Sequence, residues 1–223
     1  MNVNSTSPEI AARPQATGSA SGALRLRHAP SQARSRERLR RVLDGADEVL
    51  AAGGPAAFTT TRIAEVAGVS IGSVYRFFPD KEAIVEALAV RYWSDFEDLV
   101  AGVAEADGAQ PLDDPVGAVL DVLVAGFRAR PGFLGLWFGG LRTERVRDAT
   151  RPTRSAIAGS IGRILARHWP EASPPTLARV SEMAVLAGDG LLREAFRRDR
   201  SGDPTVLAES KHMLKAYIAE RLR

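Results

Sequence analysis

A short stretch of the chain gathers side chains that suit the binding of phosphate oxygens and base edges. The small or polar residues Ser70, Gly72 and Ser73 stand close together at the expected start of a short helix. Small residues there let a backbone approach DNA closely, and the N-terminal amides of a helix favour a phosphate oxygen. This pattern suits a surface that contacts nucleic acid.

The remaining reactive residue types predict no catalytic residue, no metal site and no cofactor. The chain has no cysteine, which excludes thiol catalysis, thiolate zinc sites and disulfides. Its three histidines, His28, His168 and His212, lie far apart in the sequence. Glu209 and His212 have the Glu-x-x-His spacing of a di-iron bundle, but such a site needs a second copy and two further glutamates. We therefore expect a binding protein and not an enzyme.

Two short helices joined by a glycine-containing turn would position the contact residues. The sequence predicts a helix over residues 61–67, with Thr59 or Thr60 as its N-cap, a turn at 68–70 and a second helix up to residue 77. This is the helix-turn-helix arrangement, whose second helix presents its first residues to the major groove. The residues expected to pack inward are Ile63, Ala64, Ala67, Val69, Val74 and Phe78. The same spacing occurs in all-α proteins that never touch DNA, so spacing alone leaves both interpretations open.

The basic residues are concentrated near the N-terminus, although the formal charge of the 223 residues is only +3. Residues 24–41 contain seven arginines and one glutamate, a local charge of +6, while the rest of the chain carries −3. A basic arm before a helix-turn-helix adds phosphate contacts, but a charged tail can also serve only solubility. Residues 1–23 are rich in small and polar residues, so we assign a disordered basic arm to residues 1–34.

Helical periodicity continues to the end of the chain, and the predicted fold class is all-α. A helix should run from residue 35 to the break at residues 53–55, and others should follow residues 80, 114, 131, 144, 176 and 204. In the helix over residues 144–168, a break near Pro152 is left open. There is no signal-peptide pattern and no apolar run of about 18 residues, so we expect no membrane partner and a cytoplasmic location.

The segment from Phe58 to Val85, FTTTRIAEVAGVSIGSVYRFFPDKEAIV, resembles the DNA-binding signature of the tetracycline-repressor (TetR) family. The shared features are threonine before Ile-Ala, the Ala-Gly-Val-Ser turn, Gly-x-x-Tyr in the second helix, and Phe-Pro-x-Lys-Glu at the start of the next helix. The resemblance covers residues 35–100. It departs from the family pattern at Ser73-Val74, where threonine and leucine are common, and at Arg76-Phe77, where aromatic residues or histidine are common.

The resemblance implies a role for each matching residue. Thr60 would contact a phosphate, and Thr61 and Arg62 would lie near bases or backbone. Tyr75 and Lys81 would bind phosphates. The full set of implied DNA-binding residues is Thr60, Thr61, Arg62, Ser70, Ile71, Gly72, Ser73, Tyr75, Arg76 and Lys81. For Tyr75 the alternative is a packed aromatic ring with a solvated hydroxyl.

The C-terminal part has an excess of large apolar residues, and family members usually hold an inducer pocket there. The candidates are Phe127, Trp137, Phe138, Leu141 and Met183; taken singly each fits ordinary core better, and the resemblance favours a pocket for the group. Asp121, Glu182 and Asp189 are the candidate polar groups of such a pocket, without a ranking among them.

The resemblance also implies that the last two helices form a four-helix bundle with a second subunit. Ala184, Ala187 and Gly188 would permit close approach of the two subunits, whereas a helix pair buried within its own monomer is the alternative. A dimer suits a palindromic site, because its two recognition helices must lie one turn of DNA apart.

Together these observations predict a helix-turn-helix domain at residues 35–80 and a helical ligand-binding and dimerisation domain at residues 81–223. The expected function is that of a homodimeric, ligand-responsive regulator, a repressor that binds a palindromic double-stranded DNA operator and is released by a small-molecule inducer. Two alternatives remain: an activator of the same family, and a helical small-molecule-binding protein with no operator.

Overall fold

The computed structural model describes residues 33–223, and within that part of the chain every regular element is an α-helix. The helices are α1 (Ala33–Ala57), α2 (Thr60–Ala67), α3 (Ile71–Phe77), α4 (Lys81–Ala109), α5 (Pro115–Ala129), α6 (Pro131–Phe138), α7 (Glu144–His168), α8 (Pro174–Arg198) and α9 (Pro204–Leu222). The predicted all-α fold class is confirmed. Most of the arm predicted at residues 1–34, with Arg25 and Arg27, lies outside the described residues.

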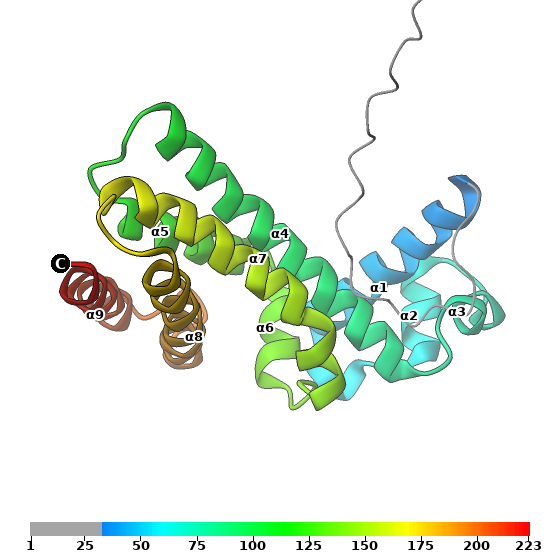
Figure 1. The fold of residues 1–223 in the computed structure, drawn as a ribbon. Helices are drawn as coiled ribbons and strands as arrows, with labels where there is room; N and C mark the ends of the chain where they lie inside the picture. The colour runs from blue at the N-terminus through cyan, green and yellow to red at the C-terminus, as the bar shows by residue number, and fades with distance from the viewer. Residues whose placement is uncertain (1–32) are drawn as a thin grey trace, which may run out of the picture.

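The helices form an elongated arrangement in which α1, α2 and α3 gather at one end and α8 and α9 lie at the other (Figure 1). Helix α4 runs from the first group towards the second, with α7 alongside it. Helix α6 packs against α1, so it also connects the two ends. None of the helices formed by residues 33–223 combines the length and apolar character needed to cross a bilayer.

Short polar side chains start the helices where the sequence predicts them. Asp80 caps α4 by accepting a hydrogen bond from the backbone N–H of Ala83 at 2.7 Å, and Asp114 caps α5 through that of Gly117 at 2.9 Å. In α1, Gly54 has a φ of 61° and interrupts the regular helix, as expected for the glycine pair. The break considered at Pro152 does not occur, because α7 continues through it.

A cluster of aromatic rings fills the core where α4, α5, α6 and α8 meet. Phe127 of α5 lies at its centre, with ring centroids 4.7 Å from Phe96, 5.0 Å from Phe133, 4.8 Å from Trp137 and 5.4 Å from Phe196. Edge-to-face and tilted pairs of this kind add stabilisation beyond the burial of their area. The cluster therefore ties four helices together through a single side chain.

A buried carboxylate fastens the far end of α4. Asp107 accepts hydrogen bonds from Nε2 of His168, at the end of α7, and from the backbone N–H of Leu112, at 2.8 and 3.1 Å. Burial raises the pKa of Asp107, but the hydrogen bonds from His168 and Leu112 and the charge of Arg167 outweigh it, so the pKa lies below its usual value.

Replacing Asp107 by asparagine should destabilise the fold by about 1–3 kcal/mol at pH 7, because charge-assisted hydrogen bonds are lost. Since the folded-state pKa of Asp107 is depressed, its contribution is present above the unfolded value of about 3.9 and is lost as the pH falls through the folded value. Urea unfolding of both proteins should show a stability difference that shrinks from pH 7 to pH 3. A difference that stays constant over this range would contradict the assignment.

Candidate nucleic-acid interface and ligand cavity

Three local interactions shape the turn between α2 and α3. Thr59 is the N-cap of α2, accepting a hydrogen bond from the N–H of Arg62 at 3.2 Å, which decides between the two threonines considered. Gly68 ends α2 in the left-handed conformation, with φ 61° and ψ 41°. Ser70 is the N-cap of α3 and accepts from the N–H of Ser73 at 3.2 Å. The helix-turn-helix geometry predicted from the sequence is thus confirmed.

Buried apolar residues hold the two short helices against each other and hold α2 against α1. Ile63 and Val74 are fully buried, as are the neighbouring Phe77 and Phe78, while Val69 is half-buried. Helices α1 and α2 approach so closely at Gly45 that a Cβ there would lie 2.9 Å from the backbone nitrogen of Ala67. This packing leaves α3 only one solvent-facing side, and it carries the hydroxyl and glycine residues.

The outer face of α2 and α3 is polar and open. Tyr75 is 42% exposed, and its hydroxyl lies 3.2 Å from Oγ1 of Thr60, which joins the two helices on that face. Ile71 is 44% exposed, although an isoleucine would normally be buried. A Cβ built on Gly72 would meet only Oγ of Ser70, at 4.0 Å, so the fold does not need glycine there.

All ten residues predicted to contact DNA lie on the surface of the molecule at its helix-turn-helix end. Thr61, Arg62, Ser70, Arg76 and Lys81 are exposed, and Thr60 and Ser73 are half-exposed. Their contact with DNA remains a prediction.

Sequence reasoning missed the role of Arg41, which it counted with the basic arm. Its guanidinium donates to the carbonyl oxygens of Ala67 and Gly68, at 2.8 and 2.9 Å, and so satisfies the C-terminus of α2. By contrast, Arg34, Arg36 and Arg38 project into solvent from the first turns of α1. The basic run therefore divides into an exposed part and a structural arginine.

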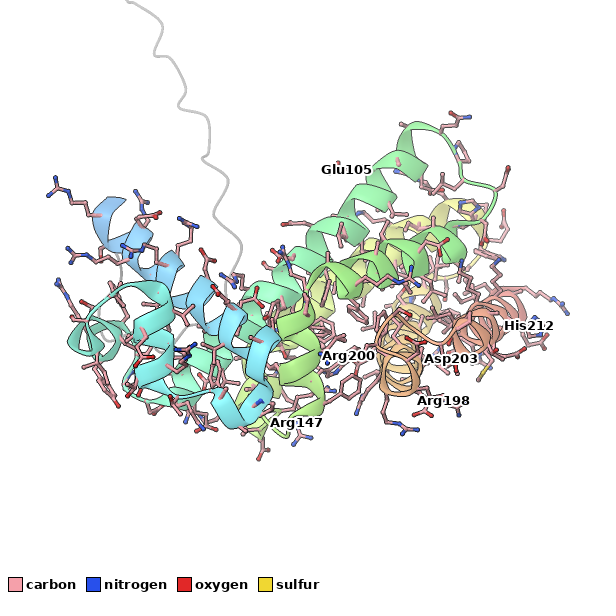
Figure 2. The ribbon with its side chains drawn as sticks, turned by 180° about the vertical axis from the view of Figure 1, so that it is seen from behind. Glu105, Arg147, Arg198, Arg200, Asp203 and His212 are labelled. Atoms are coloured by element: carbon pink, nitrogen blue, oxygen red, sulfur yellow. The ribbon has the colours of Figure 1, made fainter. Side chains whose placement is uncertain are left out.

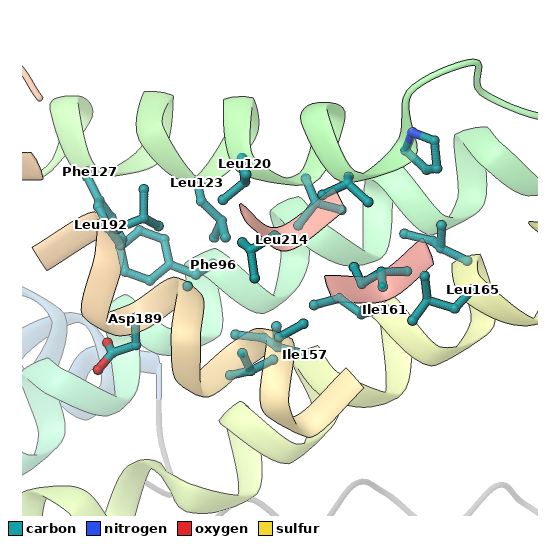
Figure 3. A pocket seen from close by; sticks show the side chains of 18 of the residues that line it. Phe96, Leu120, Leu123, Phe127, Ile157, Ile161, Leu165, Asp189, Leu192 and Leu214 are labelled. Carbon is teal, nitrogen blue, oxygen red and sulfur yellow. The ribbon is translucent and has the colours of Figure 1, made fainter. Parts of the chain in front are cut away.

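The second candidate site is an apolar cavity of about 70 Å³ between α4, α5, α7, α8 and α9 (Figure 3). Its walls are aliphatic and aromatic, and Asp189 of α8 is the one titratable residue among them. Figure 3 shows Asp189 at the same end as Phe127 and Leu192, away from Leu165. Apolar walls with a single polar group are typical of small-molecule sites.

The cavity only partly matches the residues predicted for it. Phe127 lines it, but Trp137, Phe138, Leu141 and Met183 do not. Trp137 is buried one layer away, against the ring of Phe127. Phe138 and Met183 are 39% and 41% exposed, because α6 and α8 turn these positions outward, and Leu141 is half-buried beyond the end of α6.

The three acidic residues considered for the pocket also have different surroundings. Only Asp189 lines the cavity. Asp121 is exposed and pairs with Lys211 of α9 at 2.7 Å, and Glu182 lies on a separate groove between α7 and α8. Among residues 33–223 no three acidic or histidine side chains meet as a metal site would require, and His212 points into solvent (Figure 2).

Helix α4 connects the cavity with the helix-turn-helix end. The hydroxyl of Tyr92 donates a hydrogen bond to Asp47 of α1, and Arg91 pairs with Asp44 of α1 at 2.7 Å. The next residue, Trp93, lines the cavity. Burial and the Asp47 carboxylate raise the pKa of Tyr92 well above its usual range, so its hydroxyl stays protonated as a donor.

Residues at the start of α7 also reach the helix-turn-helix end. Arg145 forms ion pairs with Glu82 and with the buried Glu86, both of α4. Three residues earlier, Arg142 pairs with Asp189 at the cavity. The segment between α6 and α7 is therefore anchored to both candidate sites.

The fold and these two sites define a helix-turn-helix protein with a helical ligand-binding domain, and two family models match it. Residues 42–88 match the model of bacterial regulatory proteins of the tetR family, and residues 110–222 match that of the tetracyclin repressor-like C-terminal domain. The chain belongs to the TetR family of transcriptional regulators, whose members are in general ligand-responsive DNA-binding repressors and not enzymes.

One solved structure supports this assignment, and others share the fold. A TetR-family transcriptional regulator from Streptomyces coelicolor is 31% identical, with a TM-score of 0.63, and the match covers 83% of this chain and 99% of that one. The transcriptional regulator FadR from Bacillus subtilis, in complex with stearoyl-CoA, is 18% identical, with a TM-score of 0.63 and coverage of 81% and 98%. The multidrug binding protein EbrR, complexed with imidazole, is 24% identical, with a TM-score of 0.58 and coverage of 86% and 92%. A comparison with curated proteins found no match.

Gly72 provides a test of the interface. Replacing it with alanine should stabilise the isolated protein by about 0.5–1 kcal/mol, because alanine favours the helix and the site is open. The same methyl group should weaken DNA binding, because it separates α3 from the base edges. Thermal unfolding and fluorescence anisotropy with DNA would measure the two effects.

Gly102→Ala is the matched control, since Gly102 lies within α4 and a Cβ there would meet nothing within 4 Å. It should give a similar stabilisation and leave DNA affinity unchanged. If both variants bind DNA like the parent, Gly72 does not face DNA.

Proposed function

We propose that this chain binds a palindromic DNA operator as a homodimer and represses transcription until a small molecule enters the cavity. The observation that carries the proposal is the open face of α3, where the fold does not require glycine at position 72 and leaves the apolar Ile71 exposed. Both residues lie in the first turn of α3, which a helix-turn-helix presents to the major groove.

Exposed apolar side chains on the last two helices support the homodimer. Met183 and Leu186 of α8 are 41% and 52% exposed, and Met213 of α9 is 54% exposed. Of the small residues predicted for a close subunit contact, Ala184 and Gly188 instead line the cavity inside the protomer, and only Ala187 faces outward. We therefore assign the subunit contact to the methionine and leucine side chains.

We propose that release from DNA follows from a shift between two conformational populations of the protein. A molecule in the cavity would touch Trp93 and Phe96, and the residue before Trp93 is bonded to α1. The molecule favours whichever arrangement of α4 it binds better, and its effect cannot exceed its difference in affinity for the two.

Two alternatives differ in what they predict. An activator of the same family would bind the operator in the same way, whereas a ligand-binding protein without an operator would select no DNA sequence. Selection from a random DNA pool should yield two inverted half-sites about 34–36 Å apart between centres. A reporter behind the selected site should rise on deletion of the gene if the chain represses; a fall would identify an activator, and no enriched sequence would refute operator binding.

Lys81→Ala should weaken binding to all DNA sequences about equally and reduce the slope of log K against log salt by about 1. The reason is that Lys81 is exposed at the start of α4, while its neighbours Asp80 and Glu82 face Arg145. An ammonium at a helix N-terminus is unfavourable unless it faces an anion. Lys215→Ala removes the same charge far from α3 and should leave the slope unchanged; equal slopes in all three proteins would reject the contact.

Leu186→Glu should weaken the dimer at least about tenfold, because a charge would be buried in the subunit contact. Sedimentation velocity across a concentration series would measure the dissociation. Leu99→Glu places the same charge at a leucine of α4 that is 37% exposed, and it should keep the dimer. A Leu186→Glu protein that sediments as the parent does would place the interface elsewhere.

A further inference from the structure

A polar cluster with excess positive charge lies at the Asp189 end of the cavity. Asp189 is the cluster's only carboxylate, and its Oδ2 pairs with Arg193 at 3.1 Å and with Arg142 at 3.5 Å. Arg154 donates to the carbonyl oxygen of Arg147 at 2.9 Å, and its charge contributes to lowering the pKa of Arg142. Two guanidinium groups therefore share the Asp189 carboxylate, and with Arg154 included the four side chains carry a formal charge of +2.

The cluster also has more hydrogen-bond donors than acceptors. Buried N–H groups without a protein partner are present on Arg142 (Nη1), Arg154 (Nε), Arg193 (Nε) and the indole of Trp137 (Nε1). The single unpartnered acceptor is Oδ1 of Asp189. Buried polar groups are costly when unpaired, so this arrangement favours a bound group that accepts hydrogen bonds and carries negative charge.

The tryptophans explain how the arginines tolerate this position without satisfying their donors. Arg142 and Arg193 lie 5.9 and 6.0 Å from the ring centroid of Trp137, and Arg154 lies 5.8 Å from that of Trp93. A cation above a ring face is stabilised electrostatically, but the N–H groups at its edge remain free. Burial lowers the pKa of Arg142, and Asp189 offsets this only in part.

The apolar part of the cavity leads directly to the cluster. Asp189 lies on the cavity wall, and Figure 3 shows its carboxylate directed away from the aliphatic side chains of Ile157 and Leu214. On the other side, Phe127 lines the cavity and packs against Trp137, with ring centroids 4.8 Å apart. A molecule extending along the cavity would therefore have its apolar body among aliphatic residues and its end beside Asp189, whose carboxylate pairs with Arg142 and Arg193.

We propose that the cavity binds an organic anion with a slender apolar body and one carboxylate, and that this carboxylate reaches past Asp189 to the unpartnered N–H groups of Arg142, Arg193 and Trp137. This deepens the proposed function and depends on it only for the effect on DNA. The volume of about 70 Å³ is about five times what one water needs, which suits a chain or a single ring. A cationic ligand would use Asp189 but would meet the positive cluster, so the anion is favoured.

Calorimetric titration of the full-length, DNA-free protein at pH 7 with octanoate, 1-octanol and octylamine tests the proposal. These probes share one chain and differ in the charge of the head group. We expect octanoate to bind about tenfold tighter than 1-octanol, as charge-assisted hydrogen bonds imply, and octylamine to bind most weakly. Equal binding of octanoate and 1-octanol, tightest binding of octylamine, or no binding of octanoate would each overturn the proposal.

Arg142→Gln should lower octanoate affinity about tenfold and leave 1-octanol affinity within about twofold, because only the head-group contact is removed. Arg151→Gln, an exposed arginine one turn before Arg154, removes the same charge and should change neither affinity. If the glutamine variant does not fold, Arg142→Lys keeps the charge with fewer donors and should give an intermediate octanoate affinity. An unchanged octanoate affinity in a folded Arg142 variant would overturn the assignment.

A separate measurement of DNA release distinguishes this proposal from the proposed function. Protein that binds octanoate yet stays on its operator would retain the anion site and contradict ligand-driven release. Protein that binds its operator but not octanoate would overturn the anion site alone.

Discussion

Helix α4 is one continuous helix that both candidate sites share. Its first residues adjoin the helix-turn-helix, with Lys81 exposed, and its middle carries Tyr92 and Trp93 side by side in sequence. Tyr92 bonds to Asp47 of α1, while Trp93 faces the cavity. Because an α-helix moves as a rigid element over a few turns, a displacement at the cavity wall is also a displacement at the α1 contact. The account of ligand response depends on this constraint.

The close packing of α6 on α1 is a second connection between the two ends of the molecule. It leaves these two helices little room to move relative to each other. A Cβ at Gly135 would lie 3.0 Å from the carbonyl oxygen of Leu50, and one at Gly132 would collide with Asp47 and with the hydroxyl of Tyr92. Packed interfaces of this kind switch between discrete arrangements and do not deform continuously. Ligand occupancy is thus expected to select among arrangements of α1, α4 and α6 together.

The helix-turn-helix was predictable from the sequence because its determinants are local. Gly68, Ser70 and Asp80 act on backbone groups within a few residues, so their roles follow from spacing alone. The ends of most helices were predictable for the same reason. The charge of the N-terminal region was also apparent, although the structural use of Arg41 was not, since its acceptors lie 26 and 27 residues away.

The cavity was much less predictable, since its walls come from five helices. Periodicity does not distinguish a residue that faces a cavity from one that faces the core or solvent. It therefore could not separate Phe127, which lines the cavity, from Met183, which does not. Asp189 was one of three acidic residues that the sequence could not rank as polar groups of a pocket. Arg142 precedes α7 outside any periodic pattern, and only the tertiary structure brings it to Asp189.

The central claim is that the DNA-facing end and the cavity are coupled through α4, and hydrogen exchange with and without the selected operator tests it most directly. Coupling is reciprocal, so DNA must affect the cavity if a ligand affects DNA binding. The account predicts altered exchange on operator binding in α2 and α3 and also in α4 beyond Tyr92 and in α6. Altered exchange confined to α1, α2 and α3, with α4 and α6 unchanged, would contradict it.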